Sequence, residues 1–273
     1  MGYFILKAKK KELFLLTFFL ATGNLLTETS QLVVTTSLLK EVVGELAGER
    51  ISVTALVAPN LCPGHGDIDT EKMAILEQAE LFLAHGFEPY LPRVEKAIRE
   101  AEGKKRLVQV NGNWQIPLVH LQAAGVVCAA LCAKFPKDAE LFQTRLNNLE
   151  IRLQSFDREI KKRVKEEGWW NAPVLCNIHL ADLLSYLGLK VVGTYRTRDD
   201  FTPVLMAELL RKGHKHKVVA VIDNLQAGAD TGQVLAADLK AKHIVFSNFP
   251  QGQSIENLLE QNLEKLFHAR RSR

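Results

Sequence analysis

The sequence predicts an α/β protein with two parallel-sheet lobes joined by one long rigid helix. Short β-rich segments alternate with segments of helical pattern, at a spacing typical of parallel sheets covered on both faces. An uninterrupted charged stretch over 137–167, without Gly or Pro, separates two such alternating regions. We therefore expect an N-terminal lobe over 31–136, a linking helix over 137–168 and a C-terminal lobe over 169–273.

In the N-terminal region, strands and helices are expected to alternate from residue 31 onward. The segment 51–57 reads ISVTALV and precedes a loop rich in Pro and Gly, which is typical of a strand and its exit turn. A later Ala/Val/Leu-rich helical run carries His120, Cys128 and Cys132, all expected to be structural. We expect strands at 31–36, 51–57, 81–84 and 107–110, and helices at 38–47, 69–80 and 89–101.

The stretch over 137–167 carries a single stripe of apolar side chains. Their steps of three and four residues place them on one face of a helix. At about 1.5 Å per residue, such a helix would be about 45 Å long. It is expected to act as a strut between the lobes, and the alternative is a surface helix that covers one sheet. The stripe consists of Phe142, Leu146, Leu149, Leu153, Phe156, Ile160 and Val164.

The alternation of strands and helices restarts after the Trp169-Trp170 pair. Pro203 is suited to the first turn of a helix, and the run VVAVI over 218–222 is expected to be a buried strand. His214 and His216 lie among lysines in a segment that we expect to be a solvated turn. Strands are expected at 172–176, 190–194, 218–222 and 243–246, and helices at 179–187, 202–212, 232–241 and 254–267.

Composition places the chain among ordinary globular proteins. It has 273 residues, of which 47% are hydrophobic and 24% are charged, with a formal net charge of +4. This length suffices for two lobes of about 100–150 residues each. Nothing in the balance of charges indicates nucleic-acid binding, and the basic tail from His268 onward is expected to be a solvated chain end.

The first thirty residues are expected to be a signal peptide or an N-terminal anchor. Lysines between Lys7 and Lys11 precede the apolar run over 13–21, and small and polar residues follow. This is the layout of a signal peptide, and the run is shorter than the about 20 residues of a membrane span. A periplasmic or other extracytoplasmic location would permit disulfides, so Cys62 and Cys176 could pair.

Several segments, in their order and spacing over about 240 residues, resemble the periplasmic zinc- and manganese-binding proteins of ABC importers. The resemblance implies a solute-binding protein, expected to be a monomer, that holds one divalent metal ion between its lobes. The ion would be cargo for an ABC permease and its ATPase, with no organic cofactor. Membrane contact would occur only through the permease or an uncleaved N-terminal anchor. The segments are Val33 to Ser37, Val53 to Pro59, Ala79 to Leu83, Phe87 to Leu91 and Tyr186 to Gly193.

That family holds its metal with two or three His and a carboxylate, ligands that suit zinc and manganese. Its first His sits in a Pro-His-x-x-Glu-Pro loop, and His65 can occupy that place here. The second His has no counterpart in the segment that contains Gln115. The third position falls on Asn177, with His179 two residues later, and the carboxylate position falls near Asn248. One ligand of four is therefore clearly kept.

Three interpretations of the cleft remain open. The metal is held by another set, such as His65, His85 and Cys62 with His179; or the cleft binds a metal complex or small polar solute; or binding has been lost. The second interpretation would use Gln115, Asn177 and Asn248. His85 and Asp223 each follow a predicted strand, at the carboxyl end where α/β sheets bind ligands. Asp223 either faces the cleft or caps a turn, and Cys62 is a ligand, a partner of Cys176 or an ordinary loop residue.

No catalytic motif competes with the resemblance. The sequence contains no Gly-x-Ser-x-Gly, no P-loop and no Gly-x-Gly-x-x-Gly, so we do not expect an enzyme. A hydrolase on the same scaffold would require a convergent acid/base or nucleophile–base pair in the cleft. A surface protein or adhesin without a transport role is a further alternative.

Overall fold

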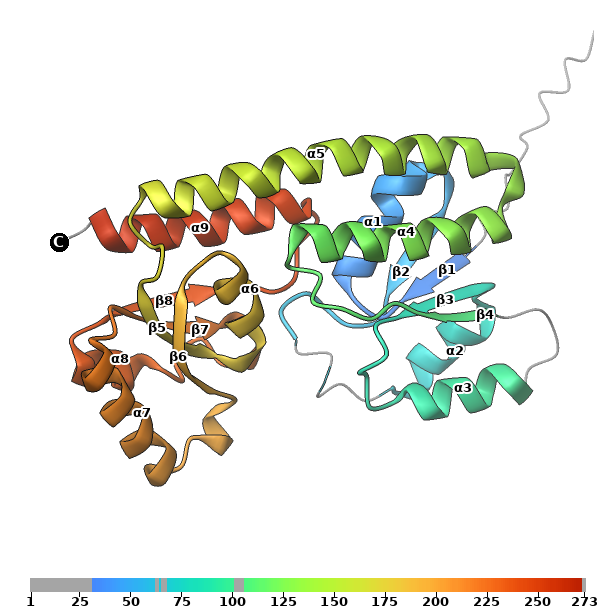
Figure 1. Ribbon diagram of the computed structural model, residues 1–273. Coiled ribbons are helices and arrows are strands. Elements are labelled where there is room, and N and C mark those ends of the chain that lie inside the picture. The colour runs from blue at the N-terminus through green and yellow to red at the C-terminus, as the bar shows by residue number, and fades with distance from the viewer. Residues whose placement is uncertain (1–30, 62–63, 65–67, 101–105, 272–273) are drawn as a thin grey trace, which may run out of the picture.

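The computed structural model describes residues 31–61, 64, 68–100 and 106–271. The predicted signal segment over 1–30, together with Cys62 and His65, lies outside these residues. The described chain forms two four-stranded parallel sheets with helices packed against them, one in each half of the sequence (Figure 1). The predicted fold class is confirmed.

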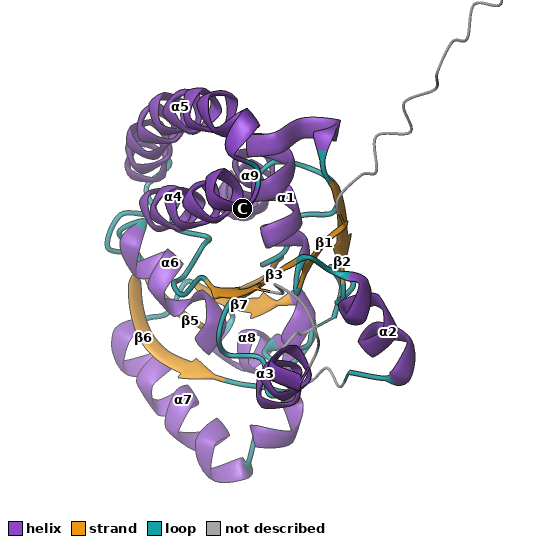
Figure 2. Cartoon of the chain, turned by 90° about the vertical axis from the view of Figure 1, so that its right-hand side faces the viewer, coloured by secondary structure: helices purple, strands orange, loops and turns teal. Residues whose placement is uncertain are grey.

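The N-terminal sheet has the strand order β2-β1-β3-β4, with every neighbouring pair parallel. Side chains alternate across it, so that Leu32 and Val34 pack with α1 and α4, whereas Val33 packs on the opposite face with α2 and α3. Figure 2 shows these two helical layers on either side of the strands. The elements are β1 (Gln31–Val34), α1 (Ser37–Ala47), β2 (Ser52–Ala55), α2 (Thr70–Gln78), β3 (Leu81–Ala84), α3 (Leu91–Glu100), β4 (Arg106–Gln109) and α4 (Pro117–Lys134).

The C-terminal sheet has the order β6-β5-β7-β8, again wholly parallel. Leu175 and Val221 face the core under α7 and α8, whereas Val174 and Ile222 face the core under α6 and α9. Because all four strands run parallel, their carboxyl ends lie at one edge of the lobe. The elements are β5 (Pro173–Asn177), α6 (Ala181–Tyr186), β6 (Lys190–Tyr195), α7 (Pro203–His216), β7 (Ala220–Asn224), α8 (Gln233–Leu239), β8 (Lys242–Phe246) and α9 (Ile255–Arg271).

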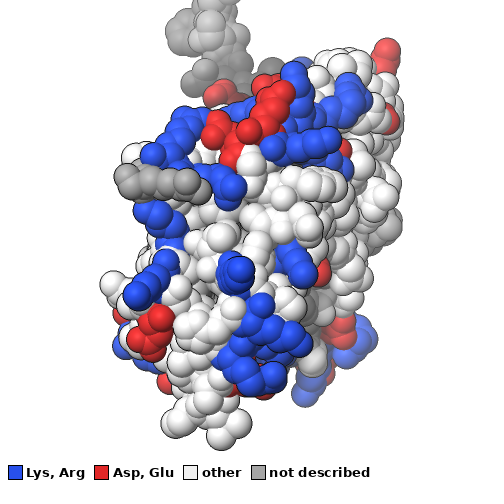
Figure 3. Space-filling view, turned by 60° about the vertical axis from the view of Figure 1, so that its left-hand side comes forward, with Lys and Arg blue, Asp and Glu red and all other residues white. Residues whose placement is uncertain are grey.

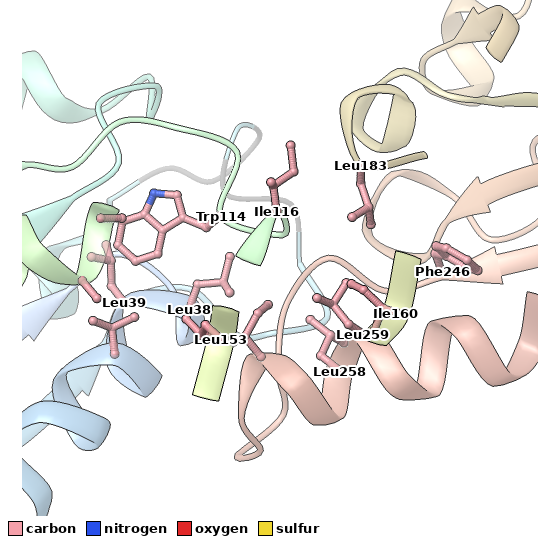
Figure 4. Packing of buried hydrophobic residues seen from close by; sticks show 14 of the residues in the cluster. Leu38, Leu39, Trp114, Ile116, Leu153, Ile160, Leu183, Phe246, Leu258 and Leu259 are labelled. Carbon is pink, nitrogen blue, oxygen red and sulfur yellow. The ribbon is translucent and has the colours of Figure 1, made fainter. Parts of the chain in front are cut away.

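Helix α5 (Ala139–Glu166) runs along both lobes (Figure 1). It follows a 3-10 turn at Pro136–Asp138 and packs against α1, α4 and α9. Five residues of its apolar stripe are fully buried and belong to one hydrophobic cluster that extends into both lobes. Figure 4 shows Leu153 and Ile160 within this cluster, between residues of the two halves. The helix is thus a strut that shares its core with each lobe.

Charged contacts attach the strut to both lobes. Arg152 donates to Glu45 of α1 at 2.7 Å and to Glu256 of α9 at 3.0 Å. Farther along, Arg163 contacts Glu260 of α9 at 2.7 Å. Arg152 therefore links an N-terminal helix to a C-terminal one through α5.

Helix α7 extends beyond the sequence-based expectation. Helix α7 continues to His216, so His214 and His216 occupy its last turn and not a solvated loop. Gly213 lets α7 pack closely on α8, because a Cβ at this position would meet the side chain of Leu239 at 2.5 Å.

Of the helices in the described ranges, α4 alone is long and apolar enough to span a membrane. It packs instead as a core helix, with Val127 and Leu131 fully buried.

Candidate functional site

A cavity of about 490 Å³ lies between the two lobes. Its walls are the start of α1 and residues at or after the ends of β2, β3, β4, β5, β7 and β8, so both sheets contribute their carboxyl ends. This is the position at which open parallel sheets bind ligands. The described residues that line this interlobe cavity include the predicted site residues His85, Gln115, His179 and Asn248.

His85 follows β3 and is held firmly in place. It is 3% exposed, and its Nε2 lies 2.8 Å from Oγ1 of Thr36, the residue that caps α1. Its ring stacks on Phe87 at 5.2 Å and meets the edge of Trp114 at 4.8 Å. Burial lowers the pKa of His85 to about 4 against the opposing effects of Glu88 and the Val110 backbone. The imidazole is therefore neutral at physiological pH, the form that a metal requires.

The turn that positions His85 depends on Glu88. Its carboxylate accepts hydrogen bonds from the backbone N–H of His85 at 2.9 Å and of Gly86 at 2.8 Å. Gly86 has φ +101°, a conformation that side chains rarely adopt. The sequence Ala84-His85-Gly86 thus turns sharply as it leaves the sheet and presents His85 at the cavity.

Trp114 and Gln115 form the wall that follows β4. Trp114 is 2% exposed and Gln115 is 6% exposed. The backbone N–H of Gln115 donates to Oδ1 of Asn113 at 3.2 Å, which fixes the turn before α4. Neither Nε1 of Trp114 nor Oε1 of Gln115 has a hydrogen-bond partner in the described chain.

Asn224, Gln226 and Asn248 supply the wall from the C-terminal lobe. Gln226 donates through Nε2 to the Pro59 carbonyl at 2.8 Å, a contact between the lobes, and its Oε1 accepts from the Asn248 N–H at 3.0 Å. Asn224 is 1% exposed and Asn248 is 8% exposed. The Nδ2 atom of Asn224 and the Oδ1 atom of Asn248 find no hydrogen-bond partner among the residues described.

His179 and Asp182 lie at the opening of the interlobe cavity, and both are exposed. They follow β5 on the 3-10 turn Ile178–Leu180 and on α6. Asp182 carries the one carboxylate in the described lining. His179 could reach a ligand from the C-terminal side, and its role as a metal ligand stays a prediction.

Asn177 is placed beside the cavity and not among its described lining residues. It is fully buried at the end of β5. Its Nδ2 donates to the Arg196 carbonyl at 2.8 Å, and its Oδ1 accepts from the His179 N–H at 3.1 Å. Both side-chain atoms are thus engaged in holding the turn that carries His179.

Asp223 also lies away from the interlobe cavity, inside the C-terminal lobe. It is fully buried and accepts from Tyr195 Oη at 2.6 Å and from the Gly232 N–H at 2.9 Å, with His243 Nε2 at 2.7 Å. The carboxylate therefore anchors the loop before α8 to strands β6 and β8. Of the two roles that the sequence left open, this arrangement resembles the capping of a turn.

Cys176 lies in the central strand β5 and is fully buried. Burial raises the pKa of its thiol to about 12, so it is not suited to thiolate chemistry. Its proposed partner Cys62 lies outside the described residues. On α4, the Sγ atoms of Cys128 and Cys132 are 3.9 Å apart as free thiols.

The described residues do not form a metal centre by themselves. No group of three or more His, Cys, Asp or Glu within the described ranges is placed to hold an ion. His85 supplies one neutral imidazole, and the neighbouring polar groups are amides and an indole, which are poor ligands for zinc. His65, the residue predicted as the first ligand, belongs to the loop outside the described chain. A metal site here would need His65 or ligands that arrive with the cargo.

Sequence reasoning missed Asn224, Gln226 and Trp114 as residues of the interlobe cavity. The signal for the first two was present, because polar residues follow the apolar run of β7. Strand β7 ends at Asn224 and not at 222, so the residues at its carboxyl end are Asn224 and Gln226. Trp114 lies beside Gln115 in the segment already selected, although an indole is not expected in a metal site.

The comparisons with known proteins agree on the architecture. The model of one family, described as zinc-uptake complex component A, periplasmic, matches residues 32–269. A search of curated proteins finds no significant match.

Solved structures share the fold at low sequence identity. A crystal structure of ZnuA has a TM-score of 0.74 and 16% identity, and the match covers 89% of this chain and 100% of that one. A Mn-bound periplasmic metal-binding protein from Candidatus Liberibacter asiaticus has a TM-score of 0.76 and 14% identity, covering 88% and 99%. Zn(II)-bound AdcA from Streptococcus pneumoniae has a TM-score of 0.73 and 17% identity, covering 88% of this chain and 57% of AdcA.

Proposed function

The chain belongs to the family of the periplasmic component A of zinc-uptake complexes, and from this premise we propose that it is the solute-binding component of an ABC importer. Its cargo would be a divalent metal ion of the zinc or manganese class. The partners would be a membrane permease and its ATPase, and the location would be the periplasm or another extracytoplasmic space. Similar solved structures are titled as bound to manganese, cadmium and zinc, which supports this class of ion.

The observation that carries the proposal is the interlobe cavity itself. It opens between two lobes that share one strut, and it collects the carboxyl ends of both sheets. A solute bound there would contact both lobes at once. We propose that His85 and His65 face the cargo from the N-terminal lobe, and that His179 and Asn248 face it from the C-terminal lobe.

Thermal melts with zinc, manganese, cobalt and nickel test the proposal. Binding to the folded state alone stabilises it by about 2.7 kcal/mol when the ion is at 100 times its Kd. We expect at least one ion to raise the Tm of the wild type, and His65→Ala to reduce that shift. His214→Ala is the matched control, because His214 lies in the last turn of α7 and not at the interlobe cavity.

Two outcomes would argue against this assignment. An equal shift in the wild type and in His65→Ala would place the ion away from His65. The absence of a shift with any of the four ions, in the presence or absence of small chelators, would contradict the proposed cargo.

A further inference from the structure

We propose that the interlobe cavity accepts its metal ion as an electrically neutral complex with a small organic chelator. This inference rests on the function proposed above and names the form in which the cargo arrives. Three separate observations support it: the unpaired polar groups in the wall, the scarcity of charged side chains among the described lining residues, and the volume of the cavity.

Four buried polar atoms in the wall lack a hydrogen-bond partner within the described part of the chain. Trp114 Nε1 and Asn224 Nδ2 are donors, whereas Gln115 Oε1 and Asn248 Oδ1 are acceptors. Leaving such a group unpaired is unfavourable, so buried polar groups nearly always find a partner. A ligand with its own donors and acceptors would pair with these atoms.

The four atoms are divided equally between the lobes. Trp114 and Gln115 belong to the N-terminal lobe, and Asn224 and Asn248 belong to the C-terminal lobe. A ligand that pairs with all of them must extend across the interlobe cavity. A single ion contacts only the groups within about 2.0–2.3 Å of its centre, so it would leave the indole N–H and the amide N–H without a partner.

Charge in the interlobe cavity favours a neutral ligand. None of its described lining residues is Lys or Arg, and the one described carboxylate, Asp182, is exposed. Lys and Arg instead gather on outer faces of the molecule (Figure 3). Among the described lining residues, a bare divalent cation would gain only the exposed Asp182 as a counter-charge for its lost water, and a free anion would find no cation. A metal ion whose charge is balanced by anionic chelators avoids both costs.

The size and the apolar parts of the wall fit an organic molecule. A volume of about 490 Å³ lies in the range of about 300–1,000 Å³ that is usual for small-molecule sites. Phe87, Trp114 and Phe249 supply aromatic surface beside the polar atoms. The carbon skeleton of a chelator would pack on these rings while its polar groups meet the amides.

Isothermal titration with three probes tests the inference. The probes are zinc chloride, L-histidine, and zinc with two equivalents of L-histidine. The last of these forms a neutral complex with N–H donors and carboxylate acceptors. A parallel series uses picolinate in place of histidine. We expect at least one complex to bind ten-fold or more tightly than zinc chloride. The chelators alone should give no binding.

Variants locate the binding. Gln115→Leu and Asn248→Leu should each weaken binding of the complex five-fold or more, because each removes an unpaired acceptor from a residue that lines the interlobe cavity. Gln154→Leu, on the exposed surface of α5, is the matched control and should leave affinity unchanged. Circular dichroism melts verify that each variant folds.

The outcomes separate the two proposals. If zinc chloride binds as tightly as both complexes, or if Gln115→Leu and Asn248→Leu bind the complex normally, the chelate inference is overturned and the metal-receptor proposal stands. If a chelator binds equally well without zinc, the proposed metal cargo is overturned as well. Failure of zinc to bind in any form overturns both.

Discussion

The Oε2 atom of Glu41 on α1 lies 3.5 Å from the Nε2 atom of His120 on α4, behind Trp114. Burial, together with the charges of Glu256 and Glu45, raises the pKa of Glu41 to about 8. Burial also lowers the pKa of His120 to about 4. At neutral pH this contact therefore joins two predominantly neutral groups and is not an ion pair.

Glu41 should make stability depend on pH. A carboxyl whose pKa is raised on folding contributes stability that is fully present below its ordinary pKa of 4.5 and is lost as pH rises through about 8. Glu41→Gln keeps the shape without the charge. We expect the variant to match the wild type at pH 4, where the carboxyl is protonated in both states, and to exceed its stability by about 3–5 kcal/mol at pH 9. Urea denaturation at the two pH values measures this difference, and a pH-independent difference would contradict it.

Arg152 should couple the two lobes through α5. It contacts Glu45 of α1 and Glu256 of α9, but it is partly exposed, which limits each ion pair to about 0.2–1 kcal/mol. We expect Arg152→Ala to lower the free energy of unfolding by about 1–2 kcal/mol. Arg158→Ala, at an exposed position of the same helix, should change it by less than about 0.5 kcal/mol. Equal effects of the two substitutions would show that the linkage adds nothing.

The apolar stripe of α5 should carry most of its contribution to stability. Ile160 is fully buried in the shared core, whereas Ile151 on the same helix is 69% exposed. Ile160→Ala should cost about 2–5 kcal/mol through lost burial and a residual cavity, and Ile151→Ala should cost less than about 1 kcal/mol. Chemical denaturation of both variants makes the comparison. A similar cost for both would place the core of α5 on another face.

Asp223 should stabilise the C-terminal lobe without contacting the cargo. Replacing it by Asn removes a charge that accepts from Tyr195, His243 and the Gly232 N–H, so we expect a loss of about 2–4 kcal/mol. Cargo affinity should stay unchanged. Asp238→Asn, on the exposed side of α8, is the control. A folded Asp223→Asn protein that no longer binds would return Asp223 to the site.

The fold could be predicted because its signals are local and repeated. Apolar runs such as that of β3, and the stripe from Phe142 to Val164, define strands and the strut through burial alone. Element boundaries were harder, because they depend on tertiary contacts. Gly213 interrupts the helical pattern in the sequence, yet α7 continues through it to His216 and packs there against Leu239 of α8, where only a small residue fits.

The interlobe cavity could be predicted in part for the same reason. The rule for the carboxyl ends of strands places His85 near the cleft, and the family resemblance places Gln115 and Asn248 there. All three residues line the interlobe cavity. The sequence predicts that this strand ends at residue 222, whereas β7 ends at Asn224. Asp223 is therefore predicted as the cleft candidate in place of Asn224. Asn177 instead donates a hydrogen bond to the Arg196 carbonyl at the end of the neighbouring strand β6. The spacing of residues along the sequence does not show that these two groups meet. Metal ligation by these residues stays a prediction.

Native mass spectrometry with elemental analysis of the protein isolated from the cells that produce it tests the central claim most directly. We expect one divalent metal ion per chain, accompanied by the mass of a small organic ligand. Denaturation before measurement should release both. Protein that is isolated from zinc- and manganese-replete cells with neither a divalent metal nor the capacity to take one up would contradict the account.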